Sequence, residues 1–167
     1  LKSEKKHLAY KMTRIKKEKI EKDAYEATIG FINSKKDSMT LRLHVSNNDI
    51  AYNYEMIRPK KDHPKSVIIY NEVSGFNFPD QTTTFLCPQI TPMTGWERTK
   101  PSYEEEYTPD APMNVKSQFG VGYTFPCLFK VGNDGWVLVS ETGVSSAYPG
   151  CRLSDYEPGK GYTVAFP

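Results

Sequence analysis

Alternation of apolar and polar side chains is the feature that most limits what this chain can fold into. Successive side chains of a β-strand point to opposite faces of a sheet, so apolar residues at every second position predict a strand with one buried face. The longest such run has these members: Val121, Tyr123, Phe125, Cys127, Phe129 and Val131. Similar runs at 24–31, 39–45 and 50–56, joined by polar turns, predict a three-stranded antiparallel meander.

Further short segments resemble strands. They lie at 67–70, 82–87, 136–139 and 162–166. The turn residues Asn133, Asp134 and Gly135 predict a hairpin. Pro126 has no amide hydrogen to donate, so its strand is expected to lie at an edge or to carry a bulge there. Many short strands without alternating helices predict an all-β fold, an antiparallel sandwich.

Only one stretch has apolar residues at helical spacing. Leu8, Met12 and Ile15 form a narrow stripe within residues 8–20, and no capping residue marks its ends. We therefore treat a helix there as the single helical candidate.

Composition excludes several classes of protein. A chain of 167 residues with 38% hydrophobic and 25% charged residues is typical of one soluble globular domain. No apolar run approaches the roughly 18 residues that a membrane-spanning helix needs. The net charge is +2, and the lysines between Lys16 and Lys22 alternate with acidic residues. This pattern favours a solvated face over nucleic-acid binding. The chain begins at Leu1 rather than Met, which is typical of a processed or excised piece.

Three cysteines, Cys87, Cys127 and Cys151, are widely spaced and lack a CxxC or HxxxH pattern. A zinc site is therefore not predicted. At most one disulfide can form within the chain, and the spacing does not select a pair.

The segment from Pro88 to Lys116 breaks the strand pattern. It is rich in proline and carries Trp96, Tyr103 and the glutamates Glu104, Glu105 and Glu106. A long loop in a compact domain is more often functional than not. Glycoside hydrolysis needs two carboxylates, and Glu104 and Glu106 would share a face in extended backbone. A solvated acidic loop, or a structural ion pair with Arg98 or Lys100, is the favoured interpretation, because the sequence indicates no buried pocket that would raise the pKa of one glutamate.

Glu141 directly follows the predicted strand at 136–139, in the sequence Val-Ser-Glu-Thr-Gly. A carboxylate at a strand end is well placed to meet a cation across a domain boundary, with Gly143 leaving room for close backbone approach. The alternative is an exposed terminal glutamate.

Several ordered motifs together resemble the N-terminal domain of glycoside hydrolase family 97. They are Ser46–Glu55, Phe76–Leu86, Met93–Arg98, Pro101–Pro109, Ser117–Pro126, Asp134–Gly143 and Cys151–Asp155. The resemblance begins at about Tyr25, so we divide the chain into a basic segment at 1–24 and a sandwich domain at 25–167.

The resemblance implies a β-super-sandwich of the galactose-mutarotase type, packed on a catalytic (β/α)8 barrel that lies outside this sequence. Enzymes of this family are similar to α-glucosidases and α-galactosidases of Bacteroides-type bacteria. A periplasmic, cell-surface or secreted location in a Gram-negative bacterium follows from that resemblance.

Site residues are implied by the same resemblance. Calcium in the family's active site is held mostly by barrel glutamates, with one glutamate from the N-terminal domain, and Glu141 stands where that glutamate is expected. From the chemistry of their side chains rather than from the resemblance, Trp96, Tyr103, Glu104 and Glu106 are candidates for binding the carbohydrate substrate. Aromatic residues in a proline-rich loop more often only pack the loop down, which is the alternative for Trp96 and Tyr103. No catalytic residue is expected here, so the fragment alone should be inactive. A stand-alone carbohydrate-binding sandwich is the alternative function.

Overall fold

The computed structural model describes residues 1–56, 68–90, 105–133, 135–146 and 148–166. All strand pairs in these ranges are antiparallel, and the ranges contain no helix. The predicted all-β, antiparallel class is therefore confirmed. The search of these residues for a helix long and apolar enough to cross a membrane found none. The chain divides into two units, 1–67 and 68–167, which we describe separately.

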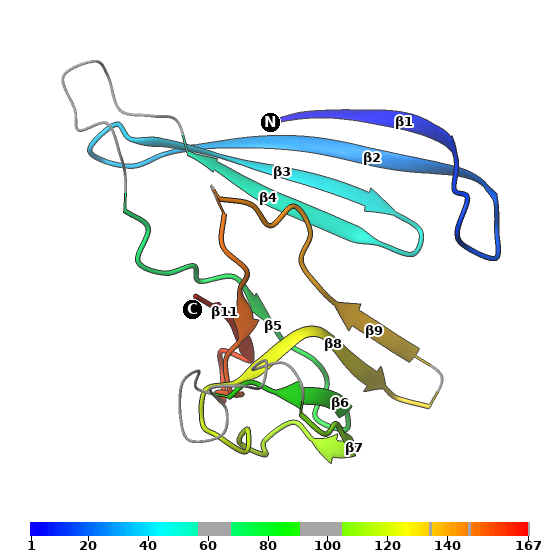
Figure 1. The fold of residues 1–167 in the computed structure, drawn as a ribbon. Coiled ribbons are helices and arrows are strands. Elements are labelled where there is room, and N and C mark those ends of the chain that lie inside the picture. Colours follow the sequence, from blue (N-terminus) through cyan, green and yellow to red (C-terminus); the bar gives the residue numbers. More distant parts are fainter. Residues whose placement is uncertain (57–67, 91–104, 134, 147, 167) are drawn as a thin grey trace. The chain divides into compact units, whose positions relative to one another are not determined.

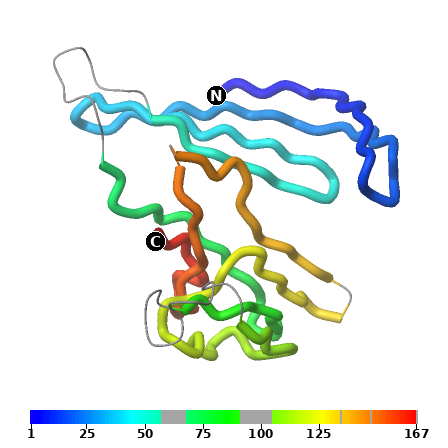
Figure 2. The backbone as a smooth tube through the Cα atoms, viewed as in Figure 1, coloured from blue at the N-terminus to red at the C-terminus, as the bar shows by residue number. Residues whose placement is uncertain are grey.

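Unit 1 is a four-stranded antiparallel sheet (Figure 1). Its strands, in chain order and in sheet order, are β1 (Lys2–Lys11), β2 (Lys19–Ile32), β3 (Ser38–Ser46) and β4 (Ile50–Met56). The backbone runs back and forth through them as a meander (Figure 2). The three strands predicted between residues 24 and 56 are confirmed.

The helix considered for residues 8–20 is wrong. Residues 2–11 form β1, which pairs with β2 in continuous register from Lys2↔Thr28 to Lys11↔Lys19. Cross-strand ion pairs favour this pairing: Lys5 contacts Asp23 at 2.6 Å, and Lys6 contacts Glu26. The interleaved lysines and acidic residues thus form ion pairs between β1 and β2. The division drawn at residue 24 falls inside β2.

The two faces of unit 1 separate by polarity as the alternation predicts. The register places these apolar residues on one face: Tyr25, Ala27, Ile29, Phe31, Met39, Leu41, Leu43, Val45, Ile50, Tyr52, Tyr54 and Met56. Burial of this face is uneven: Leu41 and Leu43 are half-buried, whereas Tyr25 is 60% exposed. Ala24, on the opposite face, is fully buried.

Unit 2 contains a seven-stranded sheet. Its strands are β5 (Gly75–Phe76), β6 (Thr83–Pro88), β7 (Thr108–Pro112), β8 (Tyr123–Val131), β9 (Gly135–Val139), β10 (Arg152–Leu153) and β11 (Tyr162–Ala165). Their order is β5-β11-β10-β8-β6-β7, and β9 pairs with β8 (Figure 1). The strands predicted near 82–87, 121–131, 136–139 and 162–166 are confirmed. The strand at 67–70 is wrong for its described residues: Ile68, Ile69 and Tyr70 pair with no strand and are exposed.

The core of unit 2 forms around the buried face of β8. Phe129 is fully buried and stacks on Phe78 at 4.3 Å between ring centroids, while Tyr162 meets it edge-on at 5.3 Å. The Tyr162 hydroxyl donates a hydrogen bond to the Met113 carbonyl at 3.0 Å, so its polar end is satisfied inside the core. Burial raises the pKa of the Cys127 thiol to about 12, and no disulfide links Cys87, Cys127 and Cys151, all of which the structure describes.

Strand β8 is interrupted at Pro126, as its missing amide hydrogen predicts. The register with β6 shifts between Phe85↔Leu128 and Cys87↔Thr124, which leaves extra residues on β8 around Pro126. Because β8 pairs with β6, β9 and β10, it is a central strand that carries a bulge. The bulge alternative is confirmed, and the edge alternative is wrong.

Two glycines before β8 give a matched test of this packing. Gly120 and Gly122 both have left-handed backbone, with φ of 73° and 93°. A Cβ on Gly122 would lie 1.9 Å from the Leu153 carbonyl oxygen of β10, whereas a Cβ on Gly120 would meet nothing within 4 Å. We expect Gly120→Ala to lower the free energy of unfolding by about 1 kcal/mol. Gly122→Ala should cost several-fold more, because it also forces β8 and β10 apart.

Urea denaturation followed by tryptophan fluorescence, to which Trp136 on β9 contributes, measures both variants. Equal losses of stability in Gly120→Ala and Gly122→Ala would contradict the close approach of β8 and β10.

Candidate functional site

The candidate site lies on the loop formed by residues 140–151, between β9 and β10. Both strands pair along the same side of β8: β9 pairs with Cys127–Val131, and β10 pairs with Tyr123 and Thr124. The 140–151 loop leaves the sheet between these two stretches, beside Phe125 and Pro126. Because Pro126 has no amide hydrogen, the departure of a neighbouring strand leaves no donor unpaired at that residue. The chain then rejoins the same side of β8 at Arg152.

Glu141 closes the base of the 140–151 loop. The backbone N–H of Cys151 donates to both carboxylate oxygens of Glu141, at 2.9 Å to Oε1 and 3.0 Å to Oε2. The next residue, Arg152, donates from Nε to the Val121 carbonyl at 2.7 Å and from Nη1 to the Phe166 carbonyl. The two ends of the loop are therefore held together at a half-buried carboxylate.

Gly150 provides the space beside this carboxylate. A Cβ on Gly150 would lie 3.4 Å from Glu141 Oε1, which is van der Waals contact. Gly143, to which the sequence pattern assigned this role, has nothing within 4 Å of its Cβ position. Its φ of 75° shows that it serves the loop by adopting left-handed backbone instead. The predicted close approach thus occurs at a different glycine.

A thiol, a phenol and a second carboxylate lie near Glu141. The Cys151 thiol donates to the Tyr148 hydroxyl, with 3.4 Å between Sγ and the oxygen. That hydrogen bond, followed by burial and by the charges of Glu72 and Glu141, raises the pKa of Tyr148. Burial, assisted by the same two charges, raises the pKa of Cys151, against the opposing effect of its bond to Tyr148. Both groups are therefore neutral at pH 7.

The arrangement offers negative charge to a cation and does not offer a nucleophile. Carboxylate oxygens are preferred ligands of calcium, which takes six to eight oxygens. Among the residues that the structure describes, no group of three or more His, Cys, Asp or Glu side chains is arranged to hold a metal ion. Glu141 can therefore provide only part of a metal site.

Of the other sequence-predicted residues, only Glu106 lies within the described part of the chain. Glu106 is exposed and lies just before β7, next to Tyr107, which stacks on Phe85 at 4.7 Å between ring centroids. Trp96, Tyr103 and Glu104 lie outside the described residues. Their predicted contact with substrate stays a prediction.

Sequence reasoning missed Glu72 and the amide of Cys151. Glu72 lies before β5 in a stretch without regular structure, so no periodicity marks it as a neighbour of a loop about seventy positions later. The Cys151 amide is a backbone group and has no sequence signal. Only the Pro126 interruption indicates where the neighbouring strand leaves the sheet.

Comparisons with known proteins agree with this fold. A solved structure described as the crystal structure of beta-arabinopyranosidase is 53% identical in sequence, with a TM-score of 0.88. The match covers 99% of this chain and 26% of that one. A search of curated proteins found no match. The family model Glycosyl-hydrolase 97 N-terminal matches residues 1–167, which includes the basic segment that the motifs left unplaced. The chain therefore belongs to the N-terminal domain family of glycosyl hydrolase 97.

Proposed function

We propose that this chain is the non-catalytic N-terminal domain of a glycoside hydrolase that removes a terminal sugar from a carbohydrate. The match to the beta-arabinopyranosidase structure, 53% identical over 99% of this chain, carries the proposal. Because this chain spans only 26% of that structure's length, the catalytic groups are assigned to the remaining part of such an enzyme. The (β/α)8 barrel is the expected partner, and this domain would support it and close one side of its pocket.

The sugar is proposed to have the galactose configuration. β-L-Arabinopyranose has the same ring configuration as α-D-galactopyranose at C1 to C4 and lacks only the C6 hydroxymethyl group. An enzyme related to a beta-arabinopyranosidase is thus compatible with α-galactosidase activity, which is one of the two activities that the resemblance implies. α-Glucosides differ at C4 and are the less favoured alternative. The proposed location is periplasmic, cell-surface or secreted, in a Gram-negative bacterium.

A panel of aryl glycosides tests this proposal on the intact protein that contains the chain. We expect p-nitrophenyl β-L-arabinopyranoside and p-nitrophenyl α-D-galactopyranoside to be hydrolysed with kcat/KM at least about tenfold higher than the α-D-glucopyranoside. That ratio corresponds to about 1.4 kcal/mol of discrimination at the C4 hydroxyl. Equal rates on all three substrates would exclude the galactose configuration, and no hydrolysis of any would count against the glycosidase.

Glu141 is proposed to supply one carboxylate to a calcium ion shared with the barrel. Three features of the structure are compatible with this role: its oxygens are hard ligands, Gly150 leaves them uncrowded, and Glu72 adds negative charge. The hydrogen bond from the Cys151 amide fixes where the carboxylate lies before any ion binds. A bound calcium ion would supply a fixed positive charge in the pocket. Since one carboxylate is far short of a full set of ligands, the chain alone should bind calcium weakly.

Two substitutions at Glu141 separate the proposed calcium role from the structural one. Glu141→Gln keeps an oxygen that accepts from the Cys151 amide but loses the negative charge, whereas Glu141→Ala loses both. In the intact protein, Glu141→Gln should weaken calcium affinity and calcium-dependent activity together by about tenfold or more, with little change in melting temperature. Glu141→Ala should also lower the melting temperature.

Titration calorimetry with calcium and thermal melting measure these effects. Asp80→Asn removes an exposed carboxylate of the same unit and serves as the control. If Glu141→Gln binds calcium as tightly as Asp80→Asn does, Glu141 only holds the loop in place through its hydrogen bonds and does not bind calcium.

The loop residues Trp96, Tyr103, Glu104 and Glu106 are proposed to contact the sugar. Aromatic rings stack on apolar sugar faces, and carboxylates accept hydrogen bonds from hydroxyl groups. Tyr103→Ala and Glu106→Ala in the intact enzyme should therefore each raise KM by about fivefold or more, with a smaller change in kcat.

Steady-state kinetics on the preferred aryl glycoside measures both parameters. Ser102→Ala, in the same segment, is the control. An unchanged KM in both Tyr103→Ala and Glu106→Ala would assign the loop a purely structural role.

A further inference from the structure

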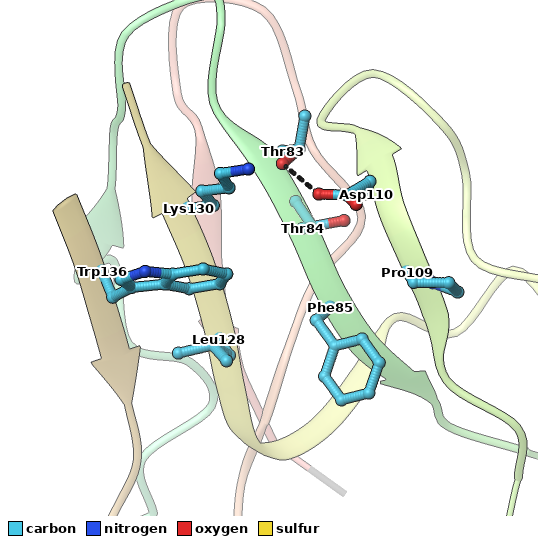
Figure 3. Close-up of a pocket in the computed structure, with 8 residues that line it drawn as sticks. All are labelled: Thr83, Thr84, Phe85, Pro109, Asp110, Leu128, Lys130 and Trp136. Carbon is cyan, nitrogen blue, oxygen red and sulfur yellow. Dashed lines mark hydrogen bonds between the residues drawn. The ribbon is translucent and has the colours of Figure 1, made fainter. Parts of the chain in front are cut away.

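A groove of about 260 Å³ lies on the outer face of the sheet in unit 2, across β7, β6, β8 and β9 (Figure 3). The register aligns Thr83, Lys130 and Trp136 on adjacent strands. It aligns Phe85 with Leu128 one step along the same face. The intervening residues Thr84 and Phe129 are buried on the opposite face. The groove therefore faces away from the core.

Its walls are apolar and partly aromatic. Trp136 is 58% exposed, and Figure 3 shows its indole reaching across β8 between Lys130 and Leu128. The Lys130 ammonium lies 5.9 Å from the centre of the indole. Phe85, also exposed, forms the wall toward β7 together with Pro109. An exposed indole held in one orientation loses little conformational entropy when a ligand covers it.

Its polar groups come from neighbouring strands. Thr83 Oγ1 donates to Asp110 Oδ1 at 3.2 Å. Within the described part of the chain, Asp110 Oδ2 has no hydrogen-bond partner and Lys130 forms no ion pair. The groove thus presents a carboxylate oxygen and an ammonium group, both still able to bind a ligand.

Asp110 is held in an unusual backbone conformation. Its φ is 49°, in the left-handed region that residues other than glycine seldom occupy. The pairing of β6 with β7 also shifts register between Thr84 and Leu86. Such strain persists where the surrounding structure imposes it, and it gathers at binding sites. At Asp110, the left-handed backbone interrupts the regular pairing of β7 with β6, and the carboxylate of Asp110 lines the groove.

The combination selects the chemistry of the ligand. One acidic and one basic group balance each other, so a strongly charged ligand would meet a like charge. An entirely apolar ligand would bury Asp110 and Lys130 without partners, which is costly. A pyranose ring fits both demands, because its hydroxyl groups both donate and accept hydrogen bonds while its C–H faces are apolar.

We propose that this groove binds a sugar unit of a neutral polysaccharide, through the indole of Trp136 and the carboxylate of Asp110. Trp136 is five positions before Glu141, so at most about 16 Å of extended backbone separates the groove residue from the candidate calcium ligand. The proposal goes beyond the proposed function and uses it only to choose the probe.

Native affinity electrophoresis of the intact protein in gels containing soluble arabinogalactan tests the groove. We expect the polysaccharide to retard the native protein. Trp136→Ala and Asp110→Ala should each weaken the apparent affinity by about tenfold or more. Trp136→Phe, which keeps an aromatic ring, should lose less. Tyr70→Ala removes an exposed aromatic ring elsewhere in unit 2 and should be retarded like the native protein.

The outcomes separate this proposal from the proposed function. Retardation that is absent from the native protein, or equal in the native protein, Trp136→Ala and Asp110→Ala, would overturn the groove. The proposed sugar site would also be overturned if a protein partner is found to occupy this face. Asp110→Asn removes the charge but keeps the shape of the side chain. If this variant has the native melting temperature, a loss of affinity for the polysaccharide cannot result from misfolding. Native protein that is retarded but hydrolyses no aryl glycoside would refute the glycosidase and leave the groove supported.

Discussion

The pairing of β8 with three other strands is the constraint on which the rest of unit 2 depends. One face of β8 carries Phe129 into the aromatic core, and the other carries Lys130 beneath the outer groove. Strand β9, which bears Trp136 and leads to Glu141, pairs with no described strand other than β8. Both candidate sites are therefore positioned by the same backbone ladder. Burial of Phe129 against Phe78 and Tyr162 holds that ladder in one register.

The two units use the same alternation with different results. In unit 2, the apolar face of β8 packs against aromatic residues from distant segments, and Tyr123, Cys127 and Phe129 on it are buried. In unit 1, the twelve apolar residues of the meander share a face, yet Tyr25 on that face remains 60% exposed. The polar face carries ion pairs: Lys22 is bonded to Asp49 at 2.7 Å, and His44 lies 3.6 Å from Glu26. Alternation thus decides which side chains share a face, while burial depends on what else the chain brings there.

Strand positions followed from the sequence wherever period two was long or bounded by turn residues. The runs at 39–45 and 121–131 are examples, and Pro126 even located the bulge. The helix at 8–20 failed because a narrow apolar stripe competed with charges that pair across strands, such as Lys5 with Asp23. The two-residue strands β5 and β10 are too short to carry a pattern. Glu141 was found from its place after a strand, but its partner, the Cys151 amide, could not be, because long-range backbone contacts leave no mark on residue type.

The path of the chain between β9 and β10 has a consequence for how this domain can change. Both strands run antiparallel to β8 along one side of it, so they behave as a single strand that is interrupted by a side excursion. Each end of that excursion is fixed independently, at Val139 by β8 and at Arg152 by its bonds to Val121 and Phe166. Residues added or removed between Gly143 and Pro149 would alter the outline of the domain without shifting the register of either flanking strand. The segment between Gly143 and Pro149 is thus a position where the domain can accept insertions while the carboxylate of Glu141 stays in place.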